Sequence, residues 1–198
     1  MHRELEDLRA PVGSPPAAPA APRPAPLAAH LRAHDGAVPI ARLRAEGRDD
    51  ELRAAIGAGH VVVLRRRWAV LPEAPLAVFE AIRQDGRITC VTALERLGVA
   101  VPHSVAPHIA TRRGDTDRSV AHWHRPVVPP EAGALVDPVE NALDAAALCL
   151  PAPVDRAVWQ HALDRGLLDA ARIPELRWSN DASRALARAF APAARRAA

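Results

Sequence analysis

Three consecutive arginines, Arg65, Arg66 and Arg67, are the residues of this chain best suited to holding an anion. Guanidinium groups form short, charge-assisted hydrogen bonds, often in pairs, with phosphate and carboxylate oxygens. Contacts of this kind give affinity for a phosphate backbone without reading its sequence, and the counterions they release make binding weaken with salt. The alternative is a solvated turn, because all 26 basic residues of the chain are arginines.

The arginines lie between two apolar stretches, 60–64 and 68–71, which predict the two strands of a β-hairpin. A two-residue hairpin turn prefers glycine or asparagine, because its residues need positive φ angles. This tip offers only arginine, so we expect a longer or looser loop.

Three short helices are predicted to precede the hairpin. The first covers 27–31 and stops before Gly36, the second covers 39–45 and ends at Gly47, and the third begins near Asp49. In the third, Leu52, Ala55 and Ile56 share one face. Three helices followed by a basic hairpin is the order of a winged helix-turn-helix, a fold that binds duplex DNA.

The predicted third helix carries both favourable and unfavourable charges for such binding. Arg53 on it and Arg48 before it are candidate DNA contacts, whereas Asp49, Asp50 and Glu51 would repel phosphates. With one arginine of the second helix, the predicted DNA-binding set is Arg42, Arg48, Arg53, Arg65, Arg66 and Arg67.

Histidines are the next candidates for chemistry. His122 and His124 are predicted on one face of a strand, with His103 and His108 on a nearby strand, and zinc uses such ligands. Their spacing matches no strong metal signature. Cys90 and Cys149 are each flanked by apolar residues and are expected to be reduced, buried thiols that take no part. We therefore predict no metal and no cofactor.

Acidic residues near 137–144 could belong to a nuclease, but their spacing favours a structural role. Asp137, then proline, then Glu140 is typical of a helix N-terminus, with Asp144 one turn further on. No lysine is present to assist such acids, and no catalytic triad order or phosphate-binding loop occurs. We expect no enzyme, although a nuclease remnant or a metal-dependent hydrolase using His122, His124 and Asp137 stays open. An adaptor that binds protein rather than DNA is a third possibility.

Composition divides the chain into three parts. Residues 1–26 are rich in proline and alanine and predict a disordered tail. Residues 27–72 form the predicted winged helix, and residues 73–198 a mixed α+β domain, with helices near 77–82, 89–97, 138–150, 154–165 and 182–191 and strands within 99–110 and 120–124. With 49% hydrophobic residues, a net charge of +3 and no apolar run of membrane-spanning length, we expect a cytoplasmic α+β protein.

Several segments of the chain resemble AbiEi-type antitoxins. The stretches 37–43, 52–61, 64–66 and 70–72 look like the N-terminal domain of that family. The stretches 86–94, 97–99, 138–144 and 149–151 look like the domain that follows in its actinobacterial members. Most of 27–170 is covered, and we expect a form of the family without the endonuclease domain into which many such relatives continue.

The resemblance implies a DNA-binding regulator of a type IV toxin–antitoxin system. Such antitoxins repress their own promoter through the winged helix and counter a nucleotidyltransferase-like toxin without a stable complex. By position, Arg53 would fall in the recognition helix and Arg65 and Arg66 in the wing. The implied partner is double-stranded DNA, with no membrane contact.

Overall fold

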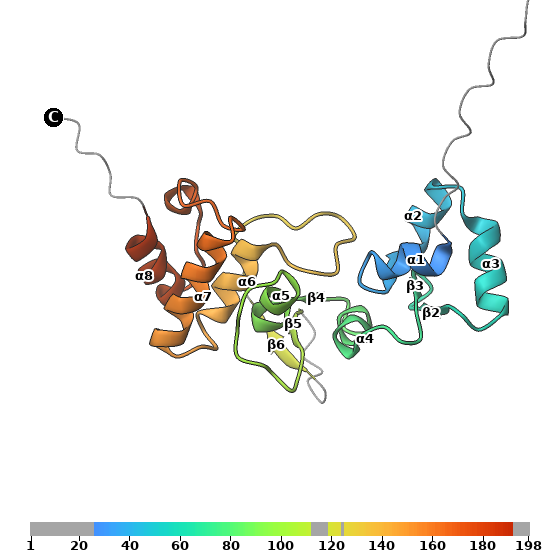
Figure 1. Cartoon of the computed structure of the whole chain (residues 1–198), viewed down its shortest axis with the longest axis horizontal. Coiled ribbons are helices and arrows are strands. Elements are labelled where there is room, and N and C mark those ends of the chain that lie inside the picture. The colour runs from blue at the N-terminus through green and yellow to red at the C-terminus, as the bar shows by residue number, and fades with distance from the viewer. Residues whose placement is uncertain (1–25, 112–118, 124, 192–198) are drawn as a thin grey trace, which may run out of the picture.

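The fold is a mixed α+β arrangement, seen in a computed structural model that describes residues 26–111, 119–123 and 125–191. Within those ranges the chain forms eight α-helices, one short 3-10 helix and two three-stranded sheets. Figure 1 shows two groups of elements side by side, with α4 between them. The predicted tail, 1–26, lies outside the described residues except for Pro26.

The first group contains three helices and one antiparallel sheet. Its elements in chain order are α1 (Leu27–Arg32), β1 (Ala37–Pro39), α2 (Ile40–Ala45), α3 (Asp49–Gly57), β2 (Val62–Leu64) and β3 (Trp68–Val70). The sheet order is β1-β3-β2, with Ala37 opposite Val70 and Leu64 opposite Trp68. The three predicted helices and the hairpin are confirmed, whereas β1 was not predicted and takes Pro39 from the expected second helix.

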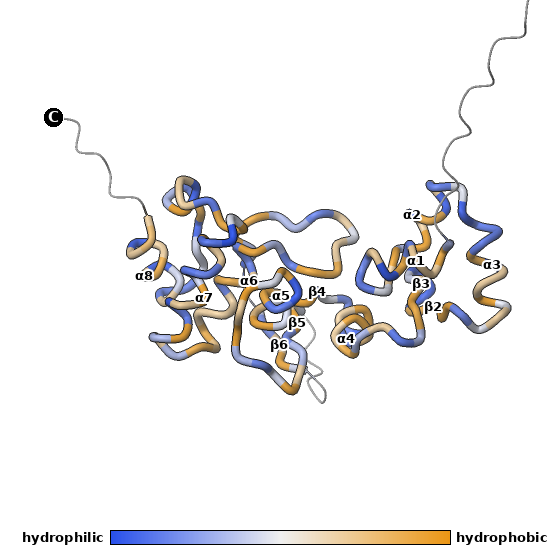
Figure 2. Tube along the Cα trace, in the orientation of Figure 1, coloured by the Kyte–Doolittle hydropathy of each residue, from blue (hydrophilic) through white to orange (hydrophobic). Residues whose placement is uncertain are grey.

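A small apolar core holds this group together. Leu31 of α1, Leu43 of α2 and Leu52 of α3 are buried against Val38 and Ala69 of the sheet. Each helix therefore buries one face on the sheet, as amphipathic spacing requires. Along the whole trace, hydrophobic segments alternate with hydrophilic ones (Figure 2).

The second group contains the remaining helices and the second sheet. Its elements are α4 (Leu76–Arg83), β4 (Arg87–Ile88), α5 (Cys90–Arg96), β5 (His108–Ala110), β6 (Val120–His122), α6 (Val139–Ala146), α7 (Ala152–Asp164), the 3-10 helix Ile173–Glu175 and α8 (Asp181–Phe190). In its sheet, β5 pairs antiparallel with β4 and parallel with β6. All five predicted helices are present, with α6 ending at Ala146 rather than 150. Of the strands expected within 99–110, only His108–Ala110 forms, because the segment from 99 to 107 is irregular.

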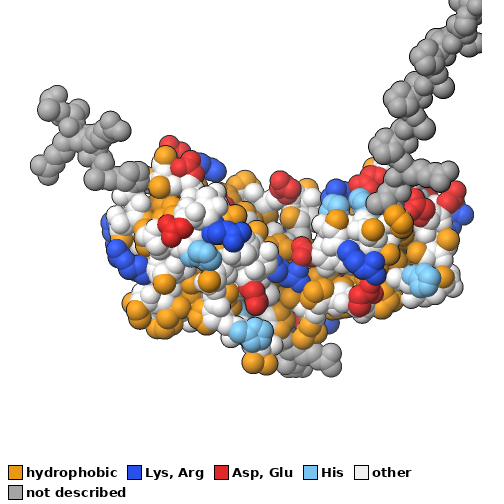
Figure 3. Space-filling model, viewed as in Figure 1, with side chains coloured by type: hydrophobic (Ala, Val, Ile, Leu, Met, Phe, Trp, Pro, Cys, Tyr) orange, Lys and Arg blue, Asp and Glu red, His pale blue; other side chains and the backbone are white. Residues whose placement is uncertain are grey.

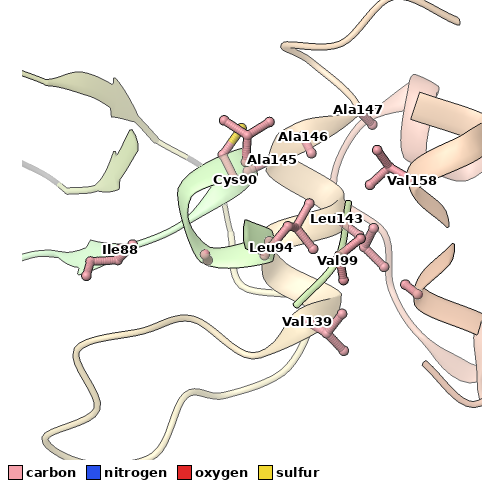
Figure 4. Close-up of a cluster of buried hydrophobic side chains, with 14 of the residues drawn as sticks. Ile88, Cys90, Leu94, Val99, Val139, Leu143, Ala145, Ala146, Ala147 and Val158 are labelled. Carbon is pink, nitrogen blue, oxygen red and sulfur yellow. The ribbon is translucent and has the colours of Figure 1, made fainter. Parts of the chain in front are cut away.

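Helices α5 and α6 pack closely at the centre of the second group. Figure 4 shows Leu94 of α5 beside Leu143 of α6, and Cys90 at the start of α5 near Ala145 and Ala146. Small side chains on α6 let the two backbones approach. The same core continues to Ala37 and Val70 of the first sheet, so the two groups share buried apolar surface.

Gly86 marks a close approach between the end of α4 and β5. A Cβ atom at Gly86 would lie 2.5 Å from the carbonyl oxygen of Ala110 and 2.8 Å from a methyl group of Ile109. Backbone atoms cannot move aside as the end of a flexible side chain can. Only glycine therefore lets the end of α4 lie against β5.

We predict that Gly86→Ala lowers the free energy of unfolding by about 1–3 kcal/mol, as overpacking does. The matched control is Gly57→Ala at the end of α3, where a Cβ meets nothing within 4 Å. Because alanine restricts the unfolded chain and favours helix, the free energy of unfolding of the control is expected to rise by about 0.5–1 kcal/mol. Urea unfolding followed by circular dichroism measures both, and equal stabilities would contradict this account of the contact.

Candidate functional site

The three arginines of the hairpin lie in an exposed loop of three residues between β2 and β3. The loop is longer than two residues, as expected, but it is tight rather than loose. Arg65 and Arg66 have φ angles of 48° and 60°, and the amide of Arg67 donates to the carbonyl of Leu64 at 3.1 Å. Two arginines thus occupy the left-handed region that glycine normally fills, which costs about 1–2 kcal/mol per residue.

Two of these arginines contact the C-terminal end of α4. Arg65 donates from Nη1 to the carbonyl oxygen of Arg83 at 2.8 Å, and Arg67 pairs with Asp85 at 3.3 Å. Among the described residues, Arg66 has no hydrogen-bond or ion-pair partner. The loop is therefore anchored on one side and presents Arg66 outward.

The helical arginines differ in their accessibility. Arg42 on α2 and Arg53 on α3 have side chains that are 52% and 76% exposed. Arg48, by contrast, has a side chain only 7% exposed and pairs with Glu51 at 2.7 Å. The expected DNA contact from Arg48 is therefore replaced by a structural role at the start of α3.

Every carboxylate at the start of α3 has an arginine partner. Asp49 pairs with Arg44 at 3.3 Å, Asp50 with Arg53, and Glu51 with Arg48. The acidic start that argues against DNA contact is thus partly neutralised. Figure 3 likewise shows acidic and basic side chains interspersed, rather than one continuous basic patch, on the face viewed.

The acids at 137–144 do not converge on one site. Asp137 is buried and accepts from Arg87 Nε at 2.6 Å. Glu140 lies 3.8 Å from Arg172. Asp144, which is also buried, accepts from the amide of Ser179 at 2.9 Å and from the hydroxyl of Ser183 at 2.6 Å. Each acid has its own structural partners, so the geometry does not favour a nuclease centre.

Two histidines and two cysteines do converge. Cys90, His108, His122 and Cys149 each offer a ligand atom, and these atoms lie within 4.8 Å of one another. The register sets His108 opposite Val120, two residues from His122, so both imidazoles share one face of the parallel pair β5–β6. The cluster is completed by Cys90 at the start of α5 and by Cys149, which follows α6.

This cluster differs from the expected arrangement of histidines. His103 is 78% exposed and lies beside Glu95, away from the cluster, and His124 lies outside the described residues. The cysteines were expected to be inert and buried, yet Cys149 is exposed and both thiols belong to the cluster. Nothing in their spacing predicts this, because the cluster joins residues as far apart in the sequence as Cys90 and Cys149.

The two thiols are held in different states. Contact with the Cys90 thiol, together with contacts to His108 and His122, lowers the pKa of Cys149 well below its usual range. The same contact with Cys149, followed by burial, raises the pKa of Cys90. The directions of the two shifts make Cys149 the more acidic thiol of the pair.

Comparisons with known proteins leave function to be argued from this geometry. No protein-family model matches the chain, and no curated protein matches its sequence. Across the described ranges, no helix has both the length and the apolar composition needed to cross a lipid bilayer.

We predict that Asp144→Ala lowers the free energy of unfolding by roughly 3 kcal/mol, because the part-buried donors of Ser179 and the buried hydroxyl of Ser183 lose a charged acceptor. The matched control is Asp164→Ala, which removes an exposed carboxylate bonded only to Gln160 among the described residues and should change stability by less than about 0.5 kcal/mol. Chemical denaturation checks both. Wild-type stability in Asp144→Ala would contradict the structural role and reopen a catalytic one.

Proposed function

We propose that residues 27–72 form a winged helix that binds duplex DNA, with Arg65, Arg66 and Arg67 at the tip of its wing. Support comes from the element order α1-β1-α2-α3-β2-β3 and from the sheet order β1-β3-β2. In this arrangement the first strand lies beside the last, and the loop of the hairpin contacts the end of α4. A helix and a loop of this kind can contact a groove and the adjacent backbone together.

The observation that carries the proposal is the exposed arginine loop. Arg66 has no partner among the described residues, and the Arg67–Asp85 pair joins side chains that are 68% and 48% exposed. Exposed ion pairs of this kind are worth only about 0–1 kcal/mol. A phosphate oxygen can therefore replace Asp85 as the partner of Arg67 at little cost.

The helices contribute in a more limited way. Arg53 on α3 and Arg42 on α2 are exposed and are the proposed helical contacts, whereas Arg48 is left out because it is buried. Arg53 must leave Asp50 before it can bind a base or a phosphate. Most of the affinity is therefore assigned to backbone contacts, with sequence reading confined to few residues.

The resemblance to AbiEi-type antitoxins extends this proposal to regulation. A winged helix that binds the chain's own promoter would repress its transcription, and the proposed biological role is that of a type IV antitoxin. No stable complex with a toxin is part of this role. A mixed α+β second domain, residues 73–198, would then support the DNA-binding part.

We predict that Arg66→Gly weakens binding to duplex DNA while it stabilises the fold. Glycine removes one cation from the wing and also relieves the left-handed backbone of residue 66, whose φ is 60°. The affinity should fall, and the slope of log K against log salt should become shallower by about 0.9 for one lost phosphate contact. The free energy of unfolding should rise by about 1 kcal/mol. Fluorescence anisotropy with labelled duplex and urea unfolding measure the two effects.

The matched control is Arg188→Ala on α8. Arg188 is an exposed arginine with no ion pair among the described residues, and it lies in the other group of elements (Figure 1). The substitution Arg188→Ala removes the same charge without changing the wing, so the affinity for duplex DNA should stay within experimental error of wild type. If Arg66→Gly and Arg188→Ala weaken binding equally, the effect is one of net charge and the wing assignment is wrong.

A further inference from the structure

The cluster of Cys90, His108, His122 and Cys149 has nearly the dimensions of a tetrahedral metal site. Cys149 Sγ lies 3.9 Å from His108 Nδ1 and 3.7 Å from His122 Nε2, and the two nitrogens are 2.8 Å apart. Zinc bond lengths of about 2.1 Å to nitrogen and 2.3 Å to sulfur place such atoms roughly 3.3–3.8 Å apart. The two nitrogens need to separate by roughly half an ångström, and the more distant atoms of the cluster, which lie within 4.8 Å of one another, need to draw together.

The hydrogen bonds around His108 turn the correct nitrogen toward the cluster. Ser104 Oγ donates to the carbonyl of Ala106 at 2.8 Å, so its only hydrogen is committed there. It then accepts from Nε2–H of His108 at 3.2 Å. Nδ1 of His108 is left with a lone pair aimed at the cluster. An outer hydrogen bond that fixes the imidazole in this way is typical of metal-binding histidines.

The backbone at Cys90 is a second, independent sign of a fixed thiol position. Cys90 has a φ angle of 53°, in the left-handed region, and its side chain is fully buried. Residues held in such conformations persist only where their surroundings demand them, and they concentrate at functional sites. Here the conformation brings the thiol at the start of α5 to the imidazoles of β5 and β6.

We propose that these four residues bind one zinc ion in a closed structural site. Two thiolates and two neutral imidazoles are the donor set that selects zinc in tetrahedral geometry, and two thiolate charges cancel the charge of the ion. With four protein ligands, no position is left for water or substrate, so the ion is structural rather than catalytic. It joins α5, β5, β6 and the segment after α6. Because cysteine binds zinc as a thiolate, binding displaces thiol protons to solvent.

The test is metal binding by the full chain, purified under reducing conditions and reconstituted with zinc alone. One zinc per chain is expected by mass spectrometry of metals. Cobalt offered in its place should give the visible bands of a tetrahedral ion and the near-ultraviolet charge transfer of cobalt–thiolate bonds. Zinc should also protect Cys149, the exposed thiol, from alkylation by iodoacetamide.

Three variants test how far zinc binding depends on individual residues. Cys149→Ser removes a ligand at the exposed side of the site and should weaken zinc binding by more than about 100-fold, whereas Ser104→Ala removes only the outer hydrogen bond and should weaken it about 10-fold. His103→Gln is the matched control, because His103 is an exposed histidine beside Glu95 and should not change zinc binding. If Cys149→Ser fails to fold, the cobalt spectrum of the wild-type chain still shows whether thiolates bind the metal.

Two results would overturn the proposal. One is a wild-type chain that takes up no stoichiometric zinc and leaves Cys149 as reactive as a free thiol. The other is a purified chain that is lighter by two hydrogens, carries a Cys90–Cys149 disulfide, and after reduction gives no cobalt–thiolate band.

Discussion

The carbonyl end of α4 determines how the arginine loop is presented. Arg65 donates to the carbonyl of Arg83 and Arg67 pairs with Asp85. A helix C-terminus carries partial negative charge, so it favours a guanidinium at this position. These contacts offset part of the strain of placing Arg65 and Arg66 at positive φ. A phosphate backbone that meets the loop therefore finds Arg66 available at once and must compete with α4 for the other two.

The same helix connects the two groups of elements. Ala37 and Val70 of the first sheet belong to the larger core that includes Val78 and Ala81 of α4. Gly36 lies against Ala74, just before α4, at a distance that leaves no room for a Cβ. The arginine loop is thus fixed relative to the second sheet, where the Cys–His cluster joins strands to helices. A zinc ion there would stiffen the support on which α4 and the loop rest.

Patterns among neighbouring residues in the sequence predicted the helices and strands that depend mainly on those residues. Amphipathic spacing and glycine stops predicted the three helices before the hairpin, and the apolar runs around Arg65–Arg67 predicted its strands. Strand β1 is only three residues long and exists because Ala37 pairs with Val70, far along the chain. The Cys–His cluster escaped prediction for the same reason, since its contacts join residues as far apart in the sequence as Cys90 and Cys149. The burial of Arg48 also follows from packing that no local pattern shows.

The most direct measurement of the central claim is the affinity of the full chain for a duplex that spans its own upstream region, determined over a series of salt concentrations. If the loop and the exposed helical arginines contact phosphates, log K should fall linearly with log salt. Each contact should contribute about −0.9 to the slope. Binding that does not weaken with salt, or no binding at low salt, would contradict the account.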